Sequence, residues 1–373
     1  MNQQYDFVDK HMYWSHPTFT NGKICMAQGS YISRMGGAAI HGNSASRIMG
    51  KPFAASEMNY AFPGICRAEC GLLLGAYASL QDWSAVYQFC YLDKLRVLNT
   101  QRAADIFELA SDPVMFLFDK QAVLLYLRRD VRPSDVELPI FVPGDFGEKH
   151  SVYESYPPDY YNAGTVAKIG AGVDDRNGCV ADAENFSKAE FLKNVQKKLK
   201  GTPGVYDPDN AFAVSSSGEL EINGKNGIFK VNTPRTAGVV LPEGKSASAG
   251  LLTVKNRKSF SACSVSALDG RNIADSGRML FLHITNVFNS RMKFSDKTFM
   301  TCENTGTLPL LAQRGIADIV LKLSPGATPR VYAVDLSGKR IQKIPSEFIN
   351  GTFKFTADVF AASQPCFVYE IVR

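Results

Sequence analysis

One carboxylate in the stretch "GKPFAASEMNYAFPG", residues 50–64, lies where an enzyme could use it. Glu57 follows the apolar run 53–55, which is typical of a strand covered on both faces, and Asn59 and a Pro-Gly turn at 63–64 come after it. In an α/β barrel the carboxyl ends of the strands carry the chemistry. We therefore take Glu57 as a candidate catalytic residue. The alternative is a carboxylate that only solvates the end of a strand.

Two other expected strands also end on groups suited to a binding site. The segment "HMYW" places His11, Tyr13 and Trp14 at the end of one strand, and "SLQDW" ends another on Trp83. A carboxylate can attack or stabilise an oxocarbenium-like centre, while a Tyr and a His orient it and an indole ring covers the apolar face of a sugar. These residues therefore indicate carbohydrate chemistry. Two alternatives stay open: His11 satisfied by backbone groups, and Trp83 as a core residue.

The first 135 residues alternate strand-like and helix-like segments, which predicts parallel strands with crossover helices and all strand carboxyl ends on one side. The apolar residues of 67–78 repeat at helical spacing. A helix over 111–130 has Ser111 or Asp112 as its cap and Pro113 in its first turn. The expected strands are 5–14, the segment ending at Glu57, and 79–83, with a Gly/Ser-rich connection at 36–46.

Two further regions follow. Residues 136–205 are rich in Pro, Gly and Tyr, and we expect an irregular insertion with one amphipathic helix over 187–201. Residues 206–373 read as successive strands and turns without crossover helices, which predicts a β-sandwich. Hairpins or turns are expected within 218–233, 264–273, 329–344 and 348–360, with a closing strand at 366–372.

Composition excludes several classes of partner. The chain of 373 residues is 45% hydrophobic and 21% charged with a formal charge of +5, and no Lys/Arg cluster alternates with aromatic residues, so we expect no nucleic acid partner. The apolar run 72–80 is too short to span a bilayer, so we expect no membrane partner. No signal-peptide pattern is visible in the first fourteen residues, and the compartment stays open.

The eight cysteines form no CxxC pair. Cys66 and Cys70 have no nearby His or Cys to complete a zinc set, so we read them as buried helix positions and expect no metal or cofactor.

The order "HMYW", "KPFAASEMNYAFP", "YASLQDW" and a β-rich tail resembles the last three strands of a clan-A glycoside hydrolase, a retaining (β/α)8 barrel. The resemblance implies the C-terminal half of such a barrel over 1–135, with Glu57 as nucleophile. It implies His11 and Tyr13 as orienting groups and Trp83 as the sugar platform, with Trp14, Asn59 and Arg67 as further rim candidates. The stretches 229–240 and 331–341 are similar to the β-sandwich that often follows these barrels.

The chain departs from the family pattern in one respect. The acid/base Glu of the clan follows an Asn upstream of the His-x-Tyr strand, and only ten residues precede His11. A complete barrel takes about 250 residues, so the first five strands and the acid are expected to be missing. Glu69 and Asp82 are the nearby carboxylates, and neither is expected to replace the acid. A structural Glu57 paired with Arg67 is the alternative role.

Two function hypotheses follow. The first is a retaining glycoside hydrolase that acts on a polysaccharide or oligosaccharide, with Glu57 as nucleophile and the acid supplied elsewhere. The second is a non-catalytic, carbohydrate-associated protein derived from such an enzyme. An open edge of parallel strands is an association hazard, so we also expect self-association or a partner that supplies the rest of the barrel.

Overall fold

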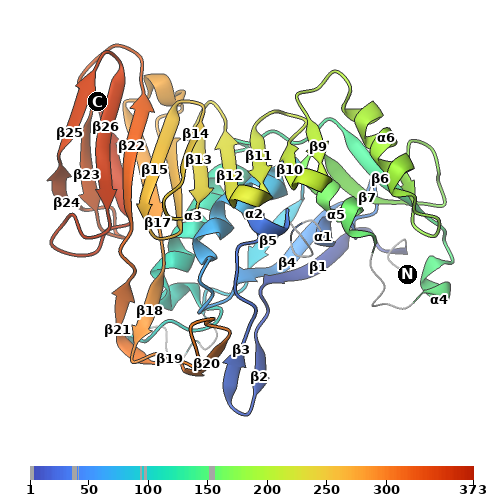
Figure 1. Ribbon diagram of the computed structural model, residues 1–373, viewed down its shortest axis with the longest axis horizontal. Coiled ribbons are helices and arrows are strands. Elements are labelled where there is room, and N and C mark those ends of the chain that lie inside the picture. Colours follow the sequence, from blue (N-terminus) through green and yellow to red (C-terminus); the bar gives the residue numbers. More distant parts are fainter. Residues whose placement is uncertain (1–3, 36–39, 41, 93–94, 96–98, 151–155) are drawn as a thin grey trace.

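The computed structural model describes residues 4–373 except for 36–39, 41, 93–94, 96–98 and 151–155 (Figure 1). Part of the connection predicted at 36–46 therefore lies outside the described residues. The chain is a mixed α/β protein with many antiparallel strands.

Three parallel strands form the sheet that carries Glu57, and β4 lies between β1 and β5. One face of this sheet is buried: Val8 and Met12 of β1 and Met58 of β4 join a core cluster that also contains residues of α2 and α3. Three strands of barrel type are thus present among the described residues, and a complete barrel is not. The bounds are β1 Val8–Trp14, β4 Phe53–Tyr60, β5 Ala85–Gln88, α2 Cys70–Leu80 and α3 Pro113–Tyr126.

The expected strand over 79–83 is wrong. Helix α2 continues to Leu80, Trp83 lies in the turn that follows, and the strand begins at Ala85. The apolar run of α2 is buried on every side, so helical periodicity gives no signal for the end of this helix.

Helix α2 packs closely against α3. A Cβ atom at Gly71 would lie 2.3 Å from the carbonyl oxygen of Phe118, and one at Gly75 would lie 2.7 Å from the Cα of Ala122. Two glycines one helical turn apart therefore allow the two backbones to approach. Of the two residues predicted as possible caps of α3, Ser111 and Asp112, it is Asp112 that caps the helix, because its Oδ1 accepts from the Val114 N–H at 2.9 Å.

The region 136–205 is more regular than expected. It contains a second parallel sheet in the order β7-β6-β8, so the prediction of an irregular insertion is wrong. The predicted helix is confirmed as α6, with Ser187 as its N-cap. The sequence of β7, "KIGAGV", is short and glycine-containing, which weakens its strand signal. The bounds are β6 Glu137–Val142, α4 Phe146–Lys149, α5 Pro158–Asn162, β7 Lys168–Val173, β8 Ala181–Asp182 and α6 Lys188–Leu199.

From residue 205 onward the described regular elements are strands and short 3₁₀ turns, and the predicted hairpins are confirmed by antiparallel pairing. The larger sheet has ten strands in the order β24-β23-β27-β17-β16-β13-β12-β11-β10-β9, and the smaller has five in the order β14-β15-β22-β26-β25.

The strands of the larger sheet are β9 Val205–Asp207, β10 Phe212–Val214, β11 Leu220–Asn223, β12 Ile228–Asn232, β13 Thr236–Leu241, β16 Ser261–Ala267, β17 Arg278–Ile284, β23 Arg330–Val334, β24 Arg340–Ile344 and β27 Val368–Val372. Those of the smaller sheet are β14 Ser246–Ala249, β15 Leu252–Lys258, β22 Ile316–Lys322, β25 Ser346–Ile349 and β26 Thr352–Asp358.

The ten-stranded sheet is covered on both faces. One face packs on the helices: Gln121 of α3 donates to the Ser264 hydroxyl at 2.8 Å, and the rings of Tyr77 and Phe229 lie 5.4 Å apart. The other face contributes Phe281 to a second core cluster shared with Phe355 of the five-stranded sheet. Helices α2 and α3 therefore lie between the three-stranded parallel sheet and the ten-stranded sheet (Figure 1).

Two small sheets extend from this body toward the rim of the parallel sheet (Figure 1). In one, strand β20 pairs with β3 of the hairpin that directly follows β1. The other consists of β18 and β21. Cys25 and Thr301, which are 276 residues apart in the sequence, thus meet beside the end of β1. The bounds are α1 Gly42–Ser44, β2 Thr18–Thr20, β3 Lys23–Cys25, β18 Val287–Ser290, β19 Lys293–Phe294, β20 Thr301–Asn304 and β21 Thr307–Ala312.

A buried ion pair joins these layers. Arg67, beyond the end of β4, pairs with Asp112 at the start of α3, and both side chains are almost fully buried. The guanidinium also donates to the Oδ1 of Asn286 at 2.8 Å. The expected alternative of an Arg67–Glu57 pair is wrong, and so is the placing of Arg67 on the rim, because its side chain is only 1% exposed.

Replacement of Arg67 by Met should lower the free energy of unfolding by about 3–5 kcal/mol, since it leaves Asp112 buried and unpaired. The matched control is Arg314→Met, because the side chain of Arg314 is half exposed in its pair with Asp358. That loss should be below about 1 kcal/mol. Urea denaturation measures both, and equal losses would contradict the structural role of the Arg67–Asp112 pair.

Candidate functional site

The register of the parallel sheet brings the predicted orienting residues to Glu57. His11 of β1 lies opposite Glu57 of β4, and Tyr13 lies opposite Asn59. Alternation along β1 places His11 and Tyr13 on the face away from buried Met12. Glu57 is the fifth of eight residues in β4 rather than its last, so the strand continues past the carboxylate to Tyr60.

Both neighbours of Glu57 contact the same carboxylate oxygen. The Tyr13 hydroxyl donates a hydrogen bond to Oε2, and His11 Nδ1 lies 3.2 Å from Oε2. No described residue hydrogen-bonds to Oε1. The carboxylate is thus held by one oxygen while the other stays available for bonding to a ligand.

Tyr13 keeps its proton at any ordinary pH. Burial first, and then the hydrogen bond and negative charge of Glu57, raise the pKa of Tyr13 well above its usual value of 10. The phenol is therefore a permanent donor to Glu57. The side chains of His11 and Glu57 are 55% and 31% exposed, so the site is open to solvent.

An aromatic wall stands beside Tyr13, and we define it as Phe89, Phe107 and His16. The ring centroids of these residues lie 6.2, 4.8 and 5.0 Å from that of Tyr13. Phe89 directly follows β5, and Phe107 belongs to the loop that leads to α3. None of these three residues was predicted from the sequence. A correct placement of β5 would have pointed to Phe89, whereas Phe107 carries no sequence signal.

Asn59 supports the aromatic wall from behind. Its Nδ2 donates to the backbone carbonyls of Phe89 and Phe107, the latter at 3.1 Å, and its Oδ1 accepts from the Tyr60 N–H at 2.7 Å. The side chain is fully buried. The predicted contact of Asn59 with substrate is therefore wrong, because its amide already bonds to the protein on both atoms.

Neither predicted tryptophan faces Glu57. Trp83 is fully buried, 5.3 Å from the ring of Phe53, and lies at the amino end of β5, whereas Glu57 lies toward the carboxyl end of β4. Trp14 follows the buried face of β1, where its Nε1 donates to the Gly29 carbonyl at 3.2 Å and its ring meets Tyr31. The predictions of a Trp83 platform and of a Trp14 contact with substrate are therefore wrong.

Glu69 and Asp82, the two carboxylates considered as acids, bond to residues other than Glu57. Glu69 is fully buried, and its oxygens accept from the Ser30 hydroxyl at 2.5 Å and the Tyr31 N–H at 2.7 Å. Asp82 pairs with Arg129 at 2.7 Å in the turn before β5. As expected, neither is placed to protonate a leaving group at Glu57.

Within the described ranges, no cluster of three or more His, Cys, Asp or Glu side chains is arranged to hold a metal ion. None of the eight cysteines, all of which lie in the described ranges, forms a disulfide bond. Cys70 opens α2 and is buried as expected, whereas Cys66 is only partly buried and precedes a 3₁₀ turn. A search of the described helices finds none with the length and apolarity needed to cross a bilayer.

Glu69 should make stability depend on pH. Burial raises its pKa to about 8, against the opposing bonds from Ser30 and Tyr31. Between its ordinary pKa near 4.5 and 8, the folded protein keeps a proton that the unfolded chain releases, so the free energy of unfolding falls as the pH rises. The loss is up to about 1.4 kcal/mol per pH unit.

Glu69→Gln should remove this dependence, because the amide stays neutral at every pH. Thermal unfolding of the two proteins should coincide below pH 4.5 and diverge toward pH 8, where the variant is the more stable. Parallel profiles across that window would show that the carboxyl titrates alike in the folded and unfolded chain.

No known family model matches the sequence, and no curated protein matches it.

Proposed function

We propose that this chain carries the nucleophile of a retaining glycoside hydrolase that acts on a polysaccharide or oligosaccharide. The observation that carries the proposal is the one-sided hold on Glu57: Tyr13 and His11 both contact Oε2 and leave Oε1 available. A nucleophilic carboxylate needs one oxygen fixed by donors and the other directed to the anomeric carbon.

The reaction divides into two displacements. Oε1 of Glu57 forms a bond to the anomeric carbon as the glycosidic C–O bond breaks, and the departing oxygen takes a proton from a second carboxyl group. Water then attacks the anomeric carbon, transfers a proton to that second group and releases the Glu57 carboxylate. Tyr13 holds the negative charge on Oε2 before attack and after release.

The aromatic wall suits the ring of a sugar. Phe89 and Phe107 present apolar edges and faces beside Tyr13, which is the kind of surface that pyranose C–H groups contact. We assign the platform role to this wall in place of Trp83.

The acid must come from outside the residues described near Glu57. A retaining mechanism requires it about 5–5.5 Å from the nucleophile. Among the described residues no strand pairs with the outer edge of β5. A small cavity of about 90 Å³ beside this edge is lined by Val86 and Leu127, and the Nε2 of Gln88 is buried there without a hydrogen bond. We propose that a polypeptide carrying the acid adds a parallel strand at this edge.

A second candidate function is a non-catalytic, carbohydrate-associated role. The contacts of Glu57 favour it, because its described side-chain partners are Tyr13 and His11 and neither is a carboxyl group. The two candidates differ in whether Glu57 can form a covalent bond to a sugar.

Incubation with 2-deoxy-2-fluoro glycosides that carry activated leaving groups should produce a covalent adduct at Glu57. Such reagents need a nucleophile but little acid assistance, so they report on Glu57 without the missing acid. Intact-mass spectrometry and peptide mapping of a panel of sugars detect the adduct and identify the sugar.

Glu57→Gln should form no adduct, and Glu303→Gln is the matched control because Glu303 binds Lys23 and Lys293 on the β3–β20 sheet. Tyr13→Phe should slow labelling by about 10-fold or more, since it removes the donor to Oε2. If folded protein forms no adduct with any sugar, the catalytic proposal fails and the non-catalytic role remains.

The isolated chain should self-associate through the edge of β5 that no described strand covers. Tyr87, in the middle of β5, is 61% exposed, and a lysine there should oppose strand pairing. Sedimentation velocity over a concentration series should show larger species for the wild type than for Tyr87→Lys. Phe360→Lys, at an exposed turn of the sandwich, is the control. Identical profiles for all three proteins would exclude this edge as the contact.

A further inference from the structure

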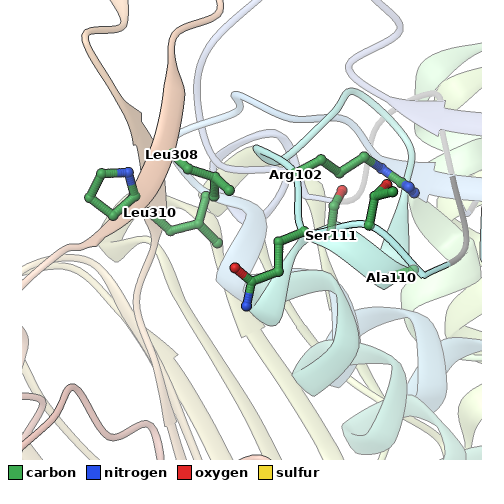
Figure 2. Close-up of a pocket in the computed structure, with 8 residues that line it drawn as sticks. Arg102, Ala110, Ser111, Leu308 and Leu310 are labelled. Atoms are coloured by element: carbon green, nitrogen blue, oxygen red, sulfur yellow. The ribbon is translucent and has the colours of Figure 1, made fainter.

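A cavity outside the surroundings of Glu57 lies on the loop that also carries Phe107. It has a volume of about 640 Å³, within the range of small-molecule sites. We call it the loop–hairpin pocket. Figure 2 shows its two walls facing each other across the opening. It is lined by Thr100, Gln101, Arg102, Ala110 and Ser111 of the loop and by Leu308, Pro309 and Leu310 of β21.

The two walls differ in chemistry. The loop wall presents hydroxyl, amide and guanidinium groups, whereas the β21 wall presents three consecutive aliphatic side chains. Leu308 is 41% exposed, which is unusual for a leucine in a strand. A polar wall opposite an apolar wall fits a ligand that has hydroxyl groups on its rim and C–H groups on its faces, as a sugar ring does.

The charge in the pocket is balanced. Arg102 is its one charged lining residue among those described, and Glu108 holds it, with Nε–Oε2 and NH2–Oε2 distances of 2.7 and 2.6 Å. Glu108 is nearly buried, so this pair is shielded from solvent. An anionic ligand would have to compete with Glu108 for the guanidinium. The pocket therefore favours a neutral ligand.

Both walls are fixed before any ligand binds. Asn289 of β18 brackets the loop, because its Oδ1 accepts from the Ala104 N–H and its Nδ2 donates to the Ala104 carbonyl, each at 2.9 Å. The opposite wall is β21, which pairs with the same strand β18. A preformed pocket loses little conformational entropy when a ligand binds to it.

One loop thus connects this pocket with the aromatic wall. Three residues beyond Ala104 the chain reaches Phe107, whose carbonyl accepts from Asn59 at 3.1 Å. The loop presents Phe107 to Tyr13 beside Glu57 and presents Arg102 and Ser111 to the loop–hairpin pocket.

We propose that the loop–hairpin pocket is a distal subsite that binds further units of a neutral glycan chain. The identity of the ligand as substrate rests on the function proposed for Glu57. The binding of neutral sugar units rests on the pocket itself.

The test is isothermal titration with neutral β-1,4-linked cello-, xylo- and manno-oligosaccharides of increasing length. At least one series should bind the wild type. Leu308→Asp, which removes the apolar wall, and Ala110→Arg, which fills the pocket, should each weaken binding by about tenfold or more. Leu336→Asp is the matched control, because Leu336 is also an exposed leucine, at 50%, and lies in a turn of the sandwich. The affinity of this variant should stay within about twofold of the wild type.

No binding by any series, or binding that both pocket variants leave unchanged, would overturn the proposal. The same proteins separate this failure from failure at Glu57. If Leu308→Asp forms an adduct at Glu57 and no protein binds an oligosaccharide, the subsite proposal is rejected and the nucleophile proposal stands. If the pocket variants weaken oligosaccharide binding and no protein forms an adduct, the sugar-binding pocket is supported and the catalytic role of Glu57 is rejected.

Discussion

The arrangement of the molecule depends on the buried charge of Arg67. A guanidinium removed from water must find partners for its donors, and here the partners come from three different parts of the chain. Asp112 neutralises the charge, Asn286 and the Val287 carbonyl accept from NH2, and Gly64 accepts from Nε. The exit of β4, the start of α3 and the connection from β17 to β18 therefore have to meet at one point.

Asn286 and Asn289 extend this constraint to the rim. Asn286 also donates to the Gly64 carbonyl at 3.1 Å, so β18 is fixed to the turn after β4. Three residues along the strand region, Asn289 holds both backbone groups of Ala104. From the other side, Asn59 of β4 holds the Phe107 carbonyl. Buried amides thus give an irregular loop the backbone partners that a strand would have provided.

The sequence was informative where local rules decide the structure. His11, Tyr13 and Glu57 meet because parallel strands in register align their side chains, and this follows from order along the chain. The hairpins after residue 205 follow from turn residues. The prediction for Trp83 was wrong because the expected strand was placed before β5, where the last turn of α2 lies. That helix is apolar on all sides, so its end gives no signal in the sequence. Phe107 could not be found, because its position comes from long-range bonds of Asn59 and Asn289.

The open face of the parallel sheet is where the proposed chemistry would need its acid. Parallel sheets are ordinarily covered on both faces, and here the face that carries His11 and Glu57 meets solvent. At a surface Tyr13 and His11 act on Oε2 through a high dielectric, so the electrostatic stabilisation that they give to the negative charge of the carboxylate is weak. A polypeptide that covered this face would exclude water, strengthen the bonds from Tyr13 and His11, and bring a carboxyl group toward Oε1. In the proposed function, covering this face and supplying the acid would then be one event.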